Sequence, residues 1–429
     1  MKIILKQVIL LNPYQNLNEK NDLLIEDGII KKIGNLTEED FKTSEVFDFE
    51  NKYCVPGLFD MHVHLREPGR EDEETIETGC IAAAAGGFTE IACMPNTNPN
   101  IDSAEVVRYI KDKSKDLLVE VYPIGAATLE RKGEAIAPMY ELVEAGAVAF
   151  SDDGNSIKTA GILRHVMEYA RMLNVPIIEH CEDESLACGA MNEGVVSTIL
   201  GLPGIPNVAE DLIVIRDILM AEFTGAKIHI AHISSKNAVE FVRQAKKKNI
   251  QITAEATPHH FTLTDESLKT YDTNFKMSPP LRTGEDVQAI IEGLKDGTID
   301  CIASDHAPHS IEEKEMEFIY APNGIVGLET QLGLALSELV HKKHLTLSQL
   351  VEKFSINPRK ILNIPIPLIK EGENANLTIF DKDLIWTVDI SKFKSKSKNS
   401  PFDKHLLTGK SVAVINKRKM FFDDKFFSI

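Results

Sequence analysis

Two histidines placed two residues apart are the first residues in this chain whose spacing suggests chemistry. His62 and His64 lie in the run DMHVHLREPGR, which continues an apolar stretch that begins at Val55. On a β-strand, side chains two residues apart point to the same face, as Arg66 would if the strand continued so far. The pair could therefore share a metal ion. A hydrogen-bonded pair of histidines is the alternative, and the motif alone does not decide between the two.

Further side chains of the metal-binding kind follow other short apolar runs. His180 stands in IIEHCED and His232 in HIAHIS, while FSDDG contains Asp153 and ASDHAPH contains Asp305. Together with the first pair they exceed the three protein ligands that a catalytic zinc ion usually takes. Two ions that share a bridging carboxylate would use all of them. Nitrogen and oxygen ligands without thiolates suit zinc, with manganese or cobalt as substitutes.

The other histidines and the cysteines fit structural roles better. His229 does not share a face with His232, and we expect it to be structural. His259 and His260 end an apolar run and are expected to be satisfied by hydrogen bonds, with a supporting role behind the ligands as the alternative. Cys181 should point away from the ligands and pack in the core. The six cysteines contain no C-x-x-C pair, which indicates reduced, buried thiols of a cytoplasmic protein.

Residues so far apart in sequence need a scaffold that brings them together. Between residues 55 and 309, eight short apolar runs alternate with helical patterns. Such alternation predicts a parallel sheet, and eight strands close a barrel, whereas a doubly wound open sheet is the alternative. The candidate residues stand at the C-terminal end of one run after another. Barrel enzymes build their active sites at that rim, so the barrel is favoured.

The two ends of the chain have a different pattern. Residues 1–55 and 368–429 contain short strand-like runs with turns, and neither end is large enough to form a core alone. We expect them to pair into one small β domain beside a barrel of residues 56–367. The segment SKFKSKSKNS, residues 391–400, is expected to be a solvated loop.

The overall charge limits the partners. The chain has 47 Lys and Arg residues against 65 Asp and Glu, a net charge of −18. An acidic protein of this kind is a poor partner for nucleic acid or for an anionic membrane. No apolar run approaches the roughly 18 residues of a transmembrane helix. A small-molecule substrate in the cytoplasm is therefore the expectation.

The motifs taken in order also carry a family resemblance. HVHLREPG, MPNTNP, FSDDG, EHCED, AHIS, PPLR, SDHAPH and GIVGLET resemble the motifs of dihydroorotases, in particular the long bacterial (class I) type of the amidohydrolase superfamily. The resemblance extends over nearly the whole chain. It implies a distorted (β/α)8 barrel with a small β-sandwich made from both termini. It also implies zinc-dependent, reversible cyclisation of N-carbamoyl-L-aspartate to dihydroorotate in pyrimidine biosynthesis.

The same resemblance implies a role for each site residue. The metal ligands would be His62, His64 and Asp305 for the first zinc ion, His180 and His232 for the second, and Asp153 as the bridge. The substrate contacts would be Arg66, Asn96, Ser278, His309, Asn323 and Gly324. Asp305 would also be the catalytic proton shuttle.

Three positions depart from the family pattern. Asp153 stands where many relatives bridge the metals with a carboxylated lysine, so that one or two zinc ions per chain are expected. Ser278 replaces a usual asparagine and has a shorter reach. Asn323 replaces an apolar residue in the APNG run. We expect these differences to tune affinity and to leave the reaction unchanged.

Two other functions are alternatives. A hydantoinase or allantoinase would also open a cyclic amide, but its substrate lacks the α-carboxylate that Arg66 and Asn96 would bind. A non-catalytic assembly subunit would be expected to have lost metal ligands, and this chain keeps all six. The resemblance also allows a homodimer and an association with aspartate carbamoyltransferase, and the sequence decides neither.

Overall fold

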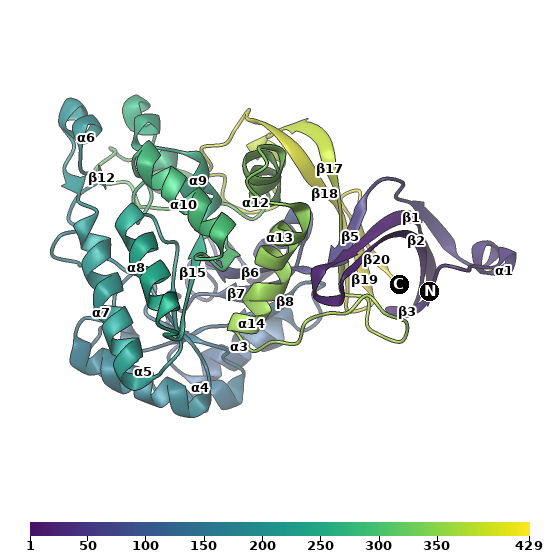
Figure 1. Cartoon of the computed structure of the whole chain (residues 1–429), viewed down its shortest axis with the longest axis horizontal. Coiled ribbons are helices and arrows are strands. Elements are labelled where there is room, and N and C mark those ends of the chain that lie inside the picture. The colour runs from purple at the N-terminus through teal and green to yellow at the C-terminus, as the bar shows by residue number, and fades with distance from the viewer.

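The centre of the molecule is a closed ring of eight parallel strands, and the computed structural model describes all 429 residues (Figure 1). The ring consists of β6 (Leu58–Val63), β7 (Phe88–Cys93), β8 with β9 (Glu120–Pro123 and Gly125–Ala126), β10 (Phe150–Ser151), β11 (Ile177–Glu179), β14 (Ile228–Ile230), β15 (Ile252–Ala256) and β16 (Cys301–Ile302). β8 and β9 are two parts of one barrel strand. A parallel bridge between Val63 and His306 joins the first strand to the last. The predicted barrel is confirmed, and an open sheet is excluded.

Helices cover the outside of the ring. The longer ones are α2 (Ile76–Gly86), α3 (Ala104–Ser114), α4 (Met139–Ala145), α5 (Ala160–Leu173), α7 (Val208–Thr224), α8 (Lys236–Lys247) and α10 (Gly284–Asp296). The shorter ones are α1 (Glu38–Lys42), α6 (Val195–Leu200), α9 (Pro258–Thr262), α11 (Ile311–Lys314), α12 (Gln331–Ala335), α13 (Leu347–Val351) and α14 (Asn357–Ile361). None of these helices combines the length and the apolar character needed to cross a membrane.

Two clusters of buried side chains hold the barrel together. The larger has 67 residues and lies where the helices pack on the strands. The smaller has 11 residues and takes side chains from nearly every barrel strand, with Phe59 and Met61 of β6 among them. It therefore fills the interior of the ring, as barrel cores do. The polar rim rests on this packed interior.

A second sheet joins the two ends of the chain beside the barrel. Its strands are β1 (Lys2–Asn12), β2 (Leu17–Glu26), β3 (Ile29–Ile33), β4 (Glu45–Asp48), β5 (Tyr53–Pro56), β17 (Leu377–Thr387), β18 (Leu406–Asn416), β19 (Lys419–Phe422) and β20 (Lys425–Ser428). β17 pairs antiparallel with β5, with Leu377 opposite Pro56. The prediction that both termini form one β structure is confirmed.

This terminal sheet curls until its ends face each other. The ring centroid of Phe47, on β4, lies 5.4 Å from that of Phe422 on β19 and 6.2 Å from that of Phe427 on β20. β4 and β20 stand far apart in the order of paired strands, so these contacts cross the enclosed space. A core of 18 buried residues fills it. The small domain is therefore sandwich-like, although its strands form one continuous sheet.

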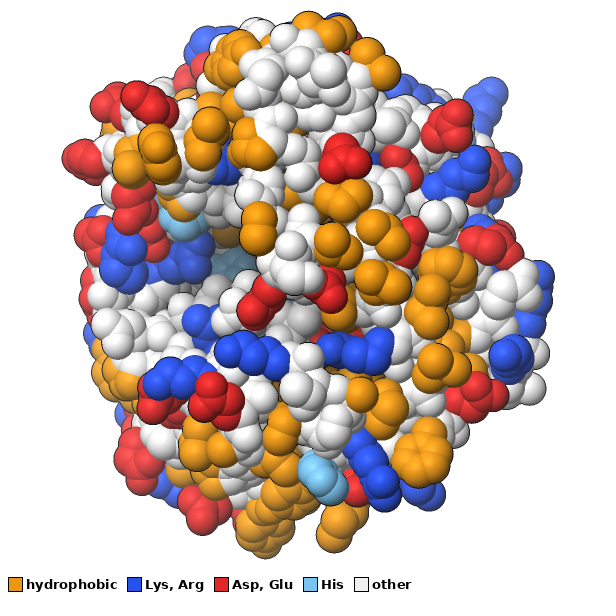
Figure 2. Space-filling view, turned by 90° about the vertical axis from the view of Figure 1, so that its left-hand side faces the viewer, with side chains coloured by type: hydrophobic (Ala, Val, Ile, Leu, Met, Phe, Trp, Pro, Cys, Tyr) orange, Lys and Arg blue, Asp and Glu red, His pale blue; other side chains and the backbone are white.

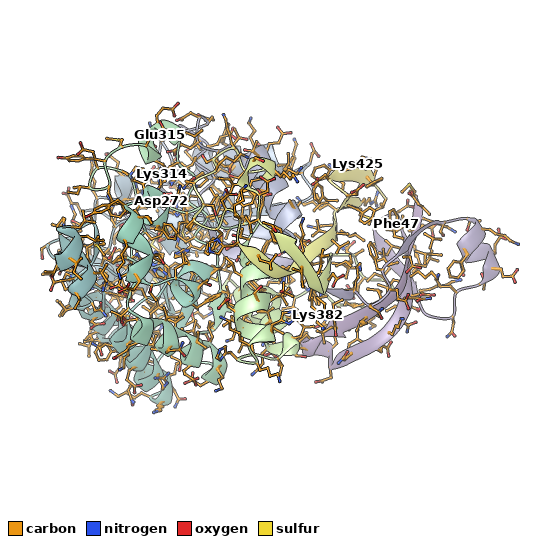
Figure 3. All side chains as sticks on the ribbon, turned by 90° about the horizontal axis from the view of Figure 1, so that it is seen from above. Phe47, Asp272, Lys314, Glu315, Lys382 and Lys425 are labelled. Carbon is orange, nitrogen blue, oxygen red and sulfur yellow. The ribbon has the colours of Figure 1, made fainter.

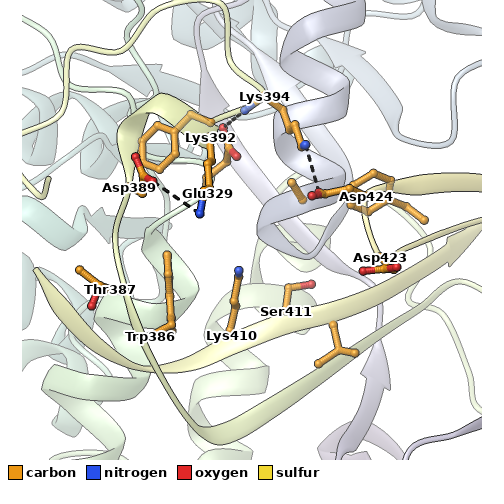
Figure 4. Close-up of a pocket in the computed structure, with 14 residues that line it drawn as sticks. Glu329, Trp386, Thr387, Asp389, Lys392, Lys394, Lys410, Ser411, Asp423 and Asp424 are labelled. Atoms are coloured by element: carbon orange, nitrogen blue, oxygen red, sulfur yellow. Dashed lines mark hydrogen bonds and ion pairs between the residues drawn. The ribbon is translucent and has the colours of Figure 1, made fainter. Parts of the chain in front are cut away.

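The segment of residues 391–400 is not the solvated loop that its composition suggests. Four alternate side chains are buried: Phe393, Ser395, Ser397 and Asn399. The carboxylate of Glu329 accepts hydrogen bonds from the backbone N–H groups of Lys394 at 2.7 Å and Ser395 at 3.1 Å (Figure 4). The expectation is wrong because the acceptors that order this segment lie on distant parts of the barrel.

Helix α7 has an inverted distribution of polarity. Its buried side includes three acidic residues: Glu210, Asp211 and Asp217. Its outer side carries five apolar residues that are between 37% and 66% exposed: Val208, Leu212, Ile215, Leu219 and Phe223. Their spacing of three and four residues places them in one stripe, which on a surface helix normally faces the core. Figure 2, which looks onto this end of the molecule, shows a band of hydrophobic side chains.

Candidate metal centre and substrate cavity

The C-terminal rim of the barrel encloses a polar cavity of about 270 Å³. Its lining residues are His64, Arg66, Asn96, Asp153, Gly154, His180, His232, Met277, Ser278, Asp305, Ala307, His309, Asn323 and Gly324. Every predicted site residue is in this set except His62, which is fully buried behind the wall. The structure therefore brings together the residues that the sequence singled out.

Asp153 is shared by two groups of side chains. In the first group, Nε2 of His62 lies 3.4 Å from Oδ1 of Asp153, and Nε2 of His64 lies 3.6 Å from Oδ2. Asp305 closes this group, because its Oδ1 is 3.0 Å from His64 Nε2 and 3.5 Å from His62 Nε2. These four side chains surround a space that one ion could occupy.

The second group lies on the other side of Asp153. Oδ1 of Asp153 is 3.5 Å from His232 Nε2 and 3.8 Å from His180 Nδ1, and the two imidazole nitrogens are 3.0 Å apart. His180 presents Nδ1 because its Nε2 lies 3.1 Å from Oε2 of Glu182. The other three histidines present Nε2.

The spacing and the chemistry of these atoms fit metal ions. Ligand atoms about 2.0–2.2 Å from a tetrahedral zinc ion lie roughly 3.3–3.6 Å from one another. Nε2 of His62 and Oδ1 of Asp153 are buried and have no hydrogen-bond partner. Burial of such unsatisfied atoms costs free energy unless another group takes their lone pairs. The nitrogen and oxygen donor set suits zinc.

Glu255, on β15, fixes residues of both groups. Its Oε1 accepts a hydrogen bond of 2.5 Å from Nδ1 of His62 and one of 3.3 Å from the backbone N–H of His232. Its Oε2 lies 3.2 Å from Nε2 of His229, which gives that histidine a structural position. Burial works to raise the pKa of Glu255, but the two imidazoles lower it to about 2. The group is therefore a carboxylate that orients His62.

Three cavity residues have a left-handed backbone. The φ angles are 60° for Arg66, 30° for His232 and 47° for Asp305. Each such conformation costs a non-glycine residue on the order of 1–3 kcal/mol. β6 ends at Val63, so Arg66 is not on the strand, and a turn of the chain brings its guanidinium to the cavity. Strain of this kind concentrates at functional sites.

Glu73 holds the two predicted carboxylate-binding residues in place. Its Oε2 lies 3.3 Å from Nε of Arg66, and its Oε1 lies 3.1 Å from Nδ1 of His309. Arg66 Nε also donates to the carbonyl of Pro308 at 3.0 Å. Burial and the charges of Arg66 and Lys314 lower the pKa of His309 to about 3, so this imidazole is neutral. Of the outer guanidinium nitrogens of Arg66, Nη2 lies 3.3 Å from Nε2 of His309, and Nη1 makes no hydrogen bond within the protein.

Asn96 and Ser278 both line the cavity, but their contacts differ. The Asn96 side-chain oxygen accepts a hydrogen bond of 2.8 Å from Nδ1 of His64. The hydroxyl of Ser278 donates to Glu182 and is therefore engaged within the protein. Glu182 thus links Ser278 to His180, and its pKa is lowered to about 2, since His180 and Ser278 outweigh the effect of burial.

Asn323 and Gly324 approach the cavity through their backbone. The side chain of Asn323 is exposed, and its carbonyl oxygen lies 2.8 Å from Nε2 of His309. A Cβ atom on Gly324 would lie 2.7 Å from the His309 ring and 2.8 Å from the carbonyl oxygen of Ala307. Only glycine fits at this position without moving the imidazole.

The remaining histidine and cysteine predictions are met in part. His260 lies 2.7 Å from the hydroxyl of Thr257 and 2.9 Å from the carbonyl of Pro279, as expected, whereas Nε2 of His259 is buried without a partner. Cys181 is buried and packs in the core. All six cysteines are free, and Cys188 alone is exposed.

Sequence reasoning missed the carboxylates that support the site. These are Glu73, Glu74, Glu182 and Glu255. Glu73 and Glu74 precede helix α2 in an acidic run that is typical of a helix start. Glu255 could have been recognised from the sequence, because an acidic residue inside an apolar barrel strand needs a buried partner.

Comparisons with known proteins agree with this architecture. A family model described as dihydro-orotase-like matches residues 51–238. A dihydroorotase of Syntrophus aciditrophicus (strain SB) is 49% identical over 426 residues, which cover 99% of this chain and 100% of that protein. A dihydroorotase of Acetivibrio thermocellus is 50% identical over 409 residues, covering 95% and 96%.

Solved structures have the same fold. The L-hydantoinase (dihydropyrimidinase) of Arthrobacter aurescens matches with a TM-score of 0.86 at 26% identity, covering 98% of this chain and 96% of that one. The dihydropyrimidinase of Brevibacillus agri matches with a TM-score of 0.83 at 20% identity, covering 99% and 96%, which is a likeness of fold alone.

Proposed function

The chain belongs to the dihydroorotase family, and from that membership we propose which of its residues carry the reaction. It is a hydrolase of cyclic amide bonds that interconverts N-carbamoyl-L-aspartate and dihydroorotate in pyrimidine biosynthesis. The observation that carries the proposal is the convergence of four histidines on the buried carboxylate of Asp153, with Asp305 against His62 and His64. A hydantoinase-like activity is not favoured, and neither is a non-catalytic subunit, because all six ligand positions are present.

The chain carries histidine and aspartate groups that could bind metal, and we propose that the metal is zinc. His62, His64 and Asp305 would hold one ion, His180 and His232 a second, and Asp153 would contact both. Bound zinc supplies Lewis-acid polarisation of the amide carbonyl and brings the pKa of water towards neutrality. The orphaned nitrogen of His62 and oxygen of Asp153 support this assignment.

Asp305 is proposed to move the proton. In the hydrolytic direction its carboxylate accepts a proton from the attacking water and delivers it to the ring nitrogen that leaves. In the biosynthetic direction it protonates the oxygen that departs as water. Burial works to raise the pKa of Asp305, but the imidazoles of His64 and His62 hold it below its usual value. The group therefore starts as a proton acceptor.

Arg66, Asn96 and His309 are proposed to bind the substrate α-carboxylate. The guanidinium fork suits a carboxylate, and Glu73 and Pro308 fix its orientation from behind. The amide N–H of Asn96 adds a hydrogen bond without adding charge, and neutral His309, whose Nε2 lies 3.3 Å from Nη2 of Arg66, packs beside the guanidinium. Ser278, Asn323 and Gly324 shape the rest of the cavity, the last two through their backbone.

A cyclisation assay tests the activity. Purified protein should convert N-carbamoyl-L-aspartate to dihydroorotate, with one or two zinc ions measured per chain on the same sample. Asp305→Asn should lower turnover by ~10²-fold or more, the usual loss when acid–base catalysis is removed. Equal turnover by that variant with metal still bound would remove Asp305 from the role of proton shuttle, and zinc-loaded wild type without activity would contradict the proposed function.

We also propose a homodimer, an association with aspartate carbamoyltransferase and a cytoplasmic location. The apolar stripe of α7 supports a homodimer, since a twofold interface places the same patch of both subunits face to face. Association with aspartate carbamoyltransferase rests on the family alone, and light scattering of the mixed proteins would test it. Free thiols at all six cysteines support a reducing, cytoplasmic location.

A further inference from the structure

Two lysines are buried next to the cavity without an acidic partner. Lys276 is 5% exposed and Lys314 is 7% exposed, and neither makes an ion pair. Burial lowers the pKa of Lys276 to about 8, and burial together with the charge of Lys276 lowers that of Lys314 to about 7. Buried lysines are normally paired, because an uncompensated ammonium group is costly to desolvate. Two of them side by side require a reason.

The ammonium groups instead bind backbone carbonyls of one short segment, residues 319–324. Lys276 Nζ donates to the carbonyls of Ile319 at 2.8 Å and Ala321 at 2.7 Å. Lys314 Nζ donates to those of Pro322 at 3.0 Å and Gly324 at 3.2 Å. Four carbonyls in six residues are thus held by two side chains that reach the segment from outside it.

The held segment is a wall of the cavity. Its Asn323 carbonyl lies 2.8 Å from Nε2 of His309, and Gly324 leaves no room beside the His309 ring for even a Cβ atom. The backbone N–H of Gly324 also donates to the carbonyl of Lys276 at 2.9 Å. Figure 3 places Lys314 and Asp272 close together at the barrel end of the molecule, away from the terminal sheet.

We propose that Lys276 and Lys314 are positioning residues that hold residues 319–324 against His309, so that this imidazole stays in place for the substrate carboxylate. The role of His309 in this inference rests on the proposed function. The segment has few buried side chains that could hold it in place, since Tyr320 is 67% exposed and Ile319 is 49% exposed. Without the lysine side chains, its end would keep the hydrogen bond from the Gly324 N–H to the backbone carbonyl of Lys276 and the one from the Asn399 amide to the Gly324 carbonyl, at 3.0 Å.

Limited proteolysis tests the structural half of the inference. Lys314→Met and Lys276→Met keep the apolar stem and remove the donors. Native protein should resist chymotrypsin at Tyr320, and each variant should be cut there at least about 10-fold faster, because cleavage follows local opening. Lys269→Met is the matched control, since Lys269 is 51% exposed and pairs only with Glu266. Wild-type cleavage rates in both variants, or faster cleavage spread over the whole chain, would overturn the proposal.

Kinetics test the functional half. A contact to the α-carboxylate exists before and during the reaction, so its loss should raise KM for dihydroorotate about 10-fold and change kcat little. In a His309→Ala background, Lys314→Met should add almost nothing, because the lysine acts through that imidazole. Fully additive losses would show that the lysine acts elsewhere. Failure of the proposed function would appear separately, as wild type without turnover, and would leave the proteolysis result intact.

If Lys314→Met does not fold, the same two measurements on Lys276→Met decide the matter. Thermal unfolding separates the remaining possibilities. A positioning role predicts a melting temperature near that of wild type together with local cleavage. A large drop in melting temperature with unchanged KM would assign both lysines to the fold as a whole and would overturn the proposal.

Discussion

Each residue in the cavity has neighbours that decide its role. Arg66 illustrates this, because its Nε is occupied by Pro308 and Glu73, its Nη2 lies beside His309, and its side chain lines the cavity. The left-handed backbone that carries it is strained, and the clamp from Glu73 offsets that strain. An arginine fixed in this way can read a carboxylate as a bidentate partner.

Substitution of Arg66 by alanine should change specificity more than stability. Loss of one partner of a desolvated charge pair costs roughly 2–5 kcal/mol. We therefore expect kcat/KM for dihydroorotate to fall about 10²-fold or more, since each 1.4 kcal/mol is about a factor of ten. Any weak activity on a cyclic amide without the carboxylate should change little. An equal loss on both substrates would mean that Arg66 supports the metal centre.

Glu255→Gln should weaken metal binding. The variant removes the carboxylate that orients His62 and accepts from the backbone of His232. Supporting groups of this kind typically contribute 10–100-fold in metal affinity, and we expect a loss of about that size. Competition with a zinc chelator measures it, with Glu266→Gln on the exposed surface as the control. A titration curve that matches wild type would leave Glu255 with a packing role only.

The candidate metal ligands could be picked out from the sequence, but the residues that orient them could not. His62 and His64 are visible as a local motif, and the other ligands follow apolar runs in the same way. Glu255 meets His62 across 193 residues of chain, and no local pattern links the two. Burial of that carboxylate is a property of the closed barrel, and it exists only once the strands are in register.

Among the elements, the turn before α12 and the segment 391–400 depend on each other. Glu329 accepts two backbone N–H groups of this segment, and Lys394 in turn pairs with Asp424 at 3.1 Å (Figure 4). The composition of the segment, with four lysines, suggested solvent exposure. Its real environment is set by Glu74, which accepts a hydrogen bond of 2.5 Å from the hydroxyl of Ser395. Composition does not predict exposure correctly where distant acceptors order a polar loop.

Glu329 makes stability depend on pH. Burial raises its pKa to about 7, above the ordinary value of 4.5. Between these two pH values the folded protein keeps a proton that the unfolded chain has released. The free energy of unfolding therefore falls as the pH rises from 4.5 to 7, and it falls no further above about pH 7. Glu329→Gln should therefore be more stable than wild type at pH 8, by up to about 3 kcal/mol, and nearly equal to it at pH 4.5.

Urea unfolding at both pH values measures this difference. Glu285→Gln, at an exposed position of α10, is the control and should not change stability at either pH. A gain of the same size at pH 4.5 and pH 8 would show that the effect comes from the amide and not from the charge.

At the scale of the whole molecule, the barrel and the joining of both termini were predictable, and the outer surface was not. Alternating strand and helix patterns predict a parallel sheet, and the candidate residues at the C-terminal ends of successive runs favour a closed ring. The polarity of α7 runs against the usual pattern, since Glu210 and Asp217 are buried and Leu219 and Phe223 are exposed. The buried acids have partners on other elements, such as Ser234 for Glu210, which sequence alone does not show.

The α7 stripe predicts self-association. Combined replacement of Leu219 and Phe223 by glutamate should shift the protein from dimer to monomer in light scattering, because it places charge at the centre of an apolar interface. Tyr140→Glu, at a position of α4 that is 54% exposed, is the matched control and should leave the mass unchanged. A wild-type protein that is monomeric at high concentration would contradict the proposal.

Residues 393–399, which return to the barrel from the C-terminal part of the chain, complete the cavity late in synthesis. The ribosome makes every proposed metal ligand before it makes residues 393–399, and the Asn399 amide then donates to the carbonyls of Ala307 and Gly324. A chain still in synthesis, or one cut by a protease before this point, therefore has the proposed metal ligands but lacks the hydrogen bonds of Asn399 to two residues that line the cavity. We therefore expect full activity only from chains that were translated through residues 393–399.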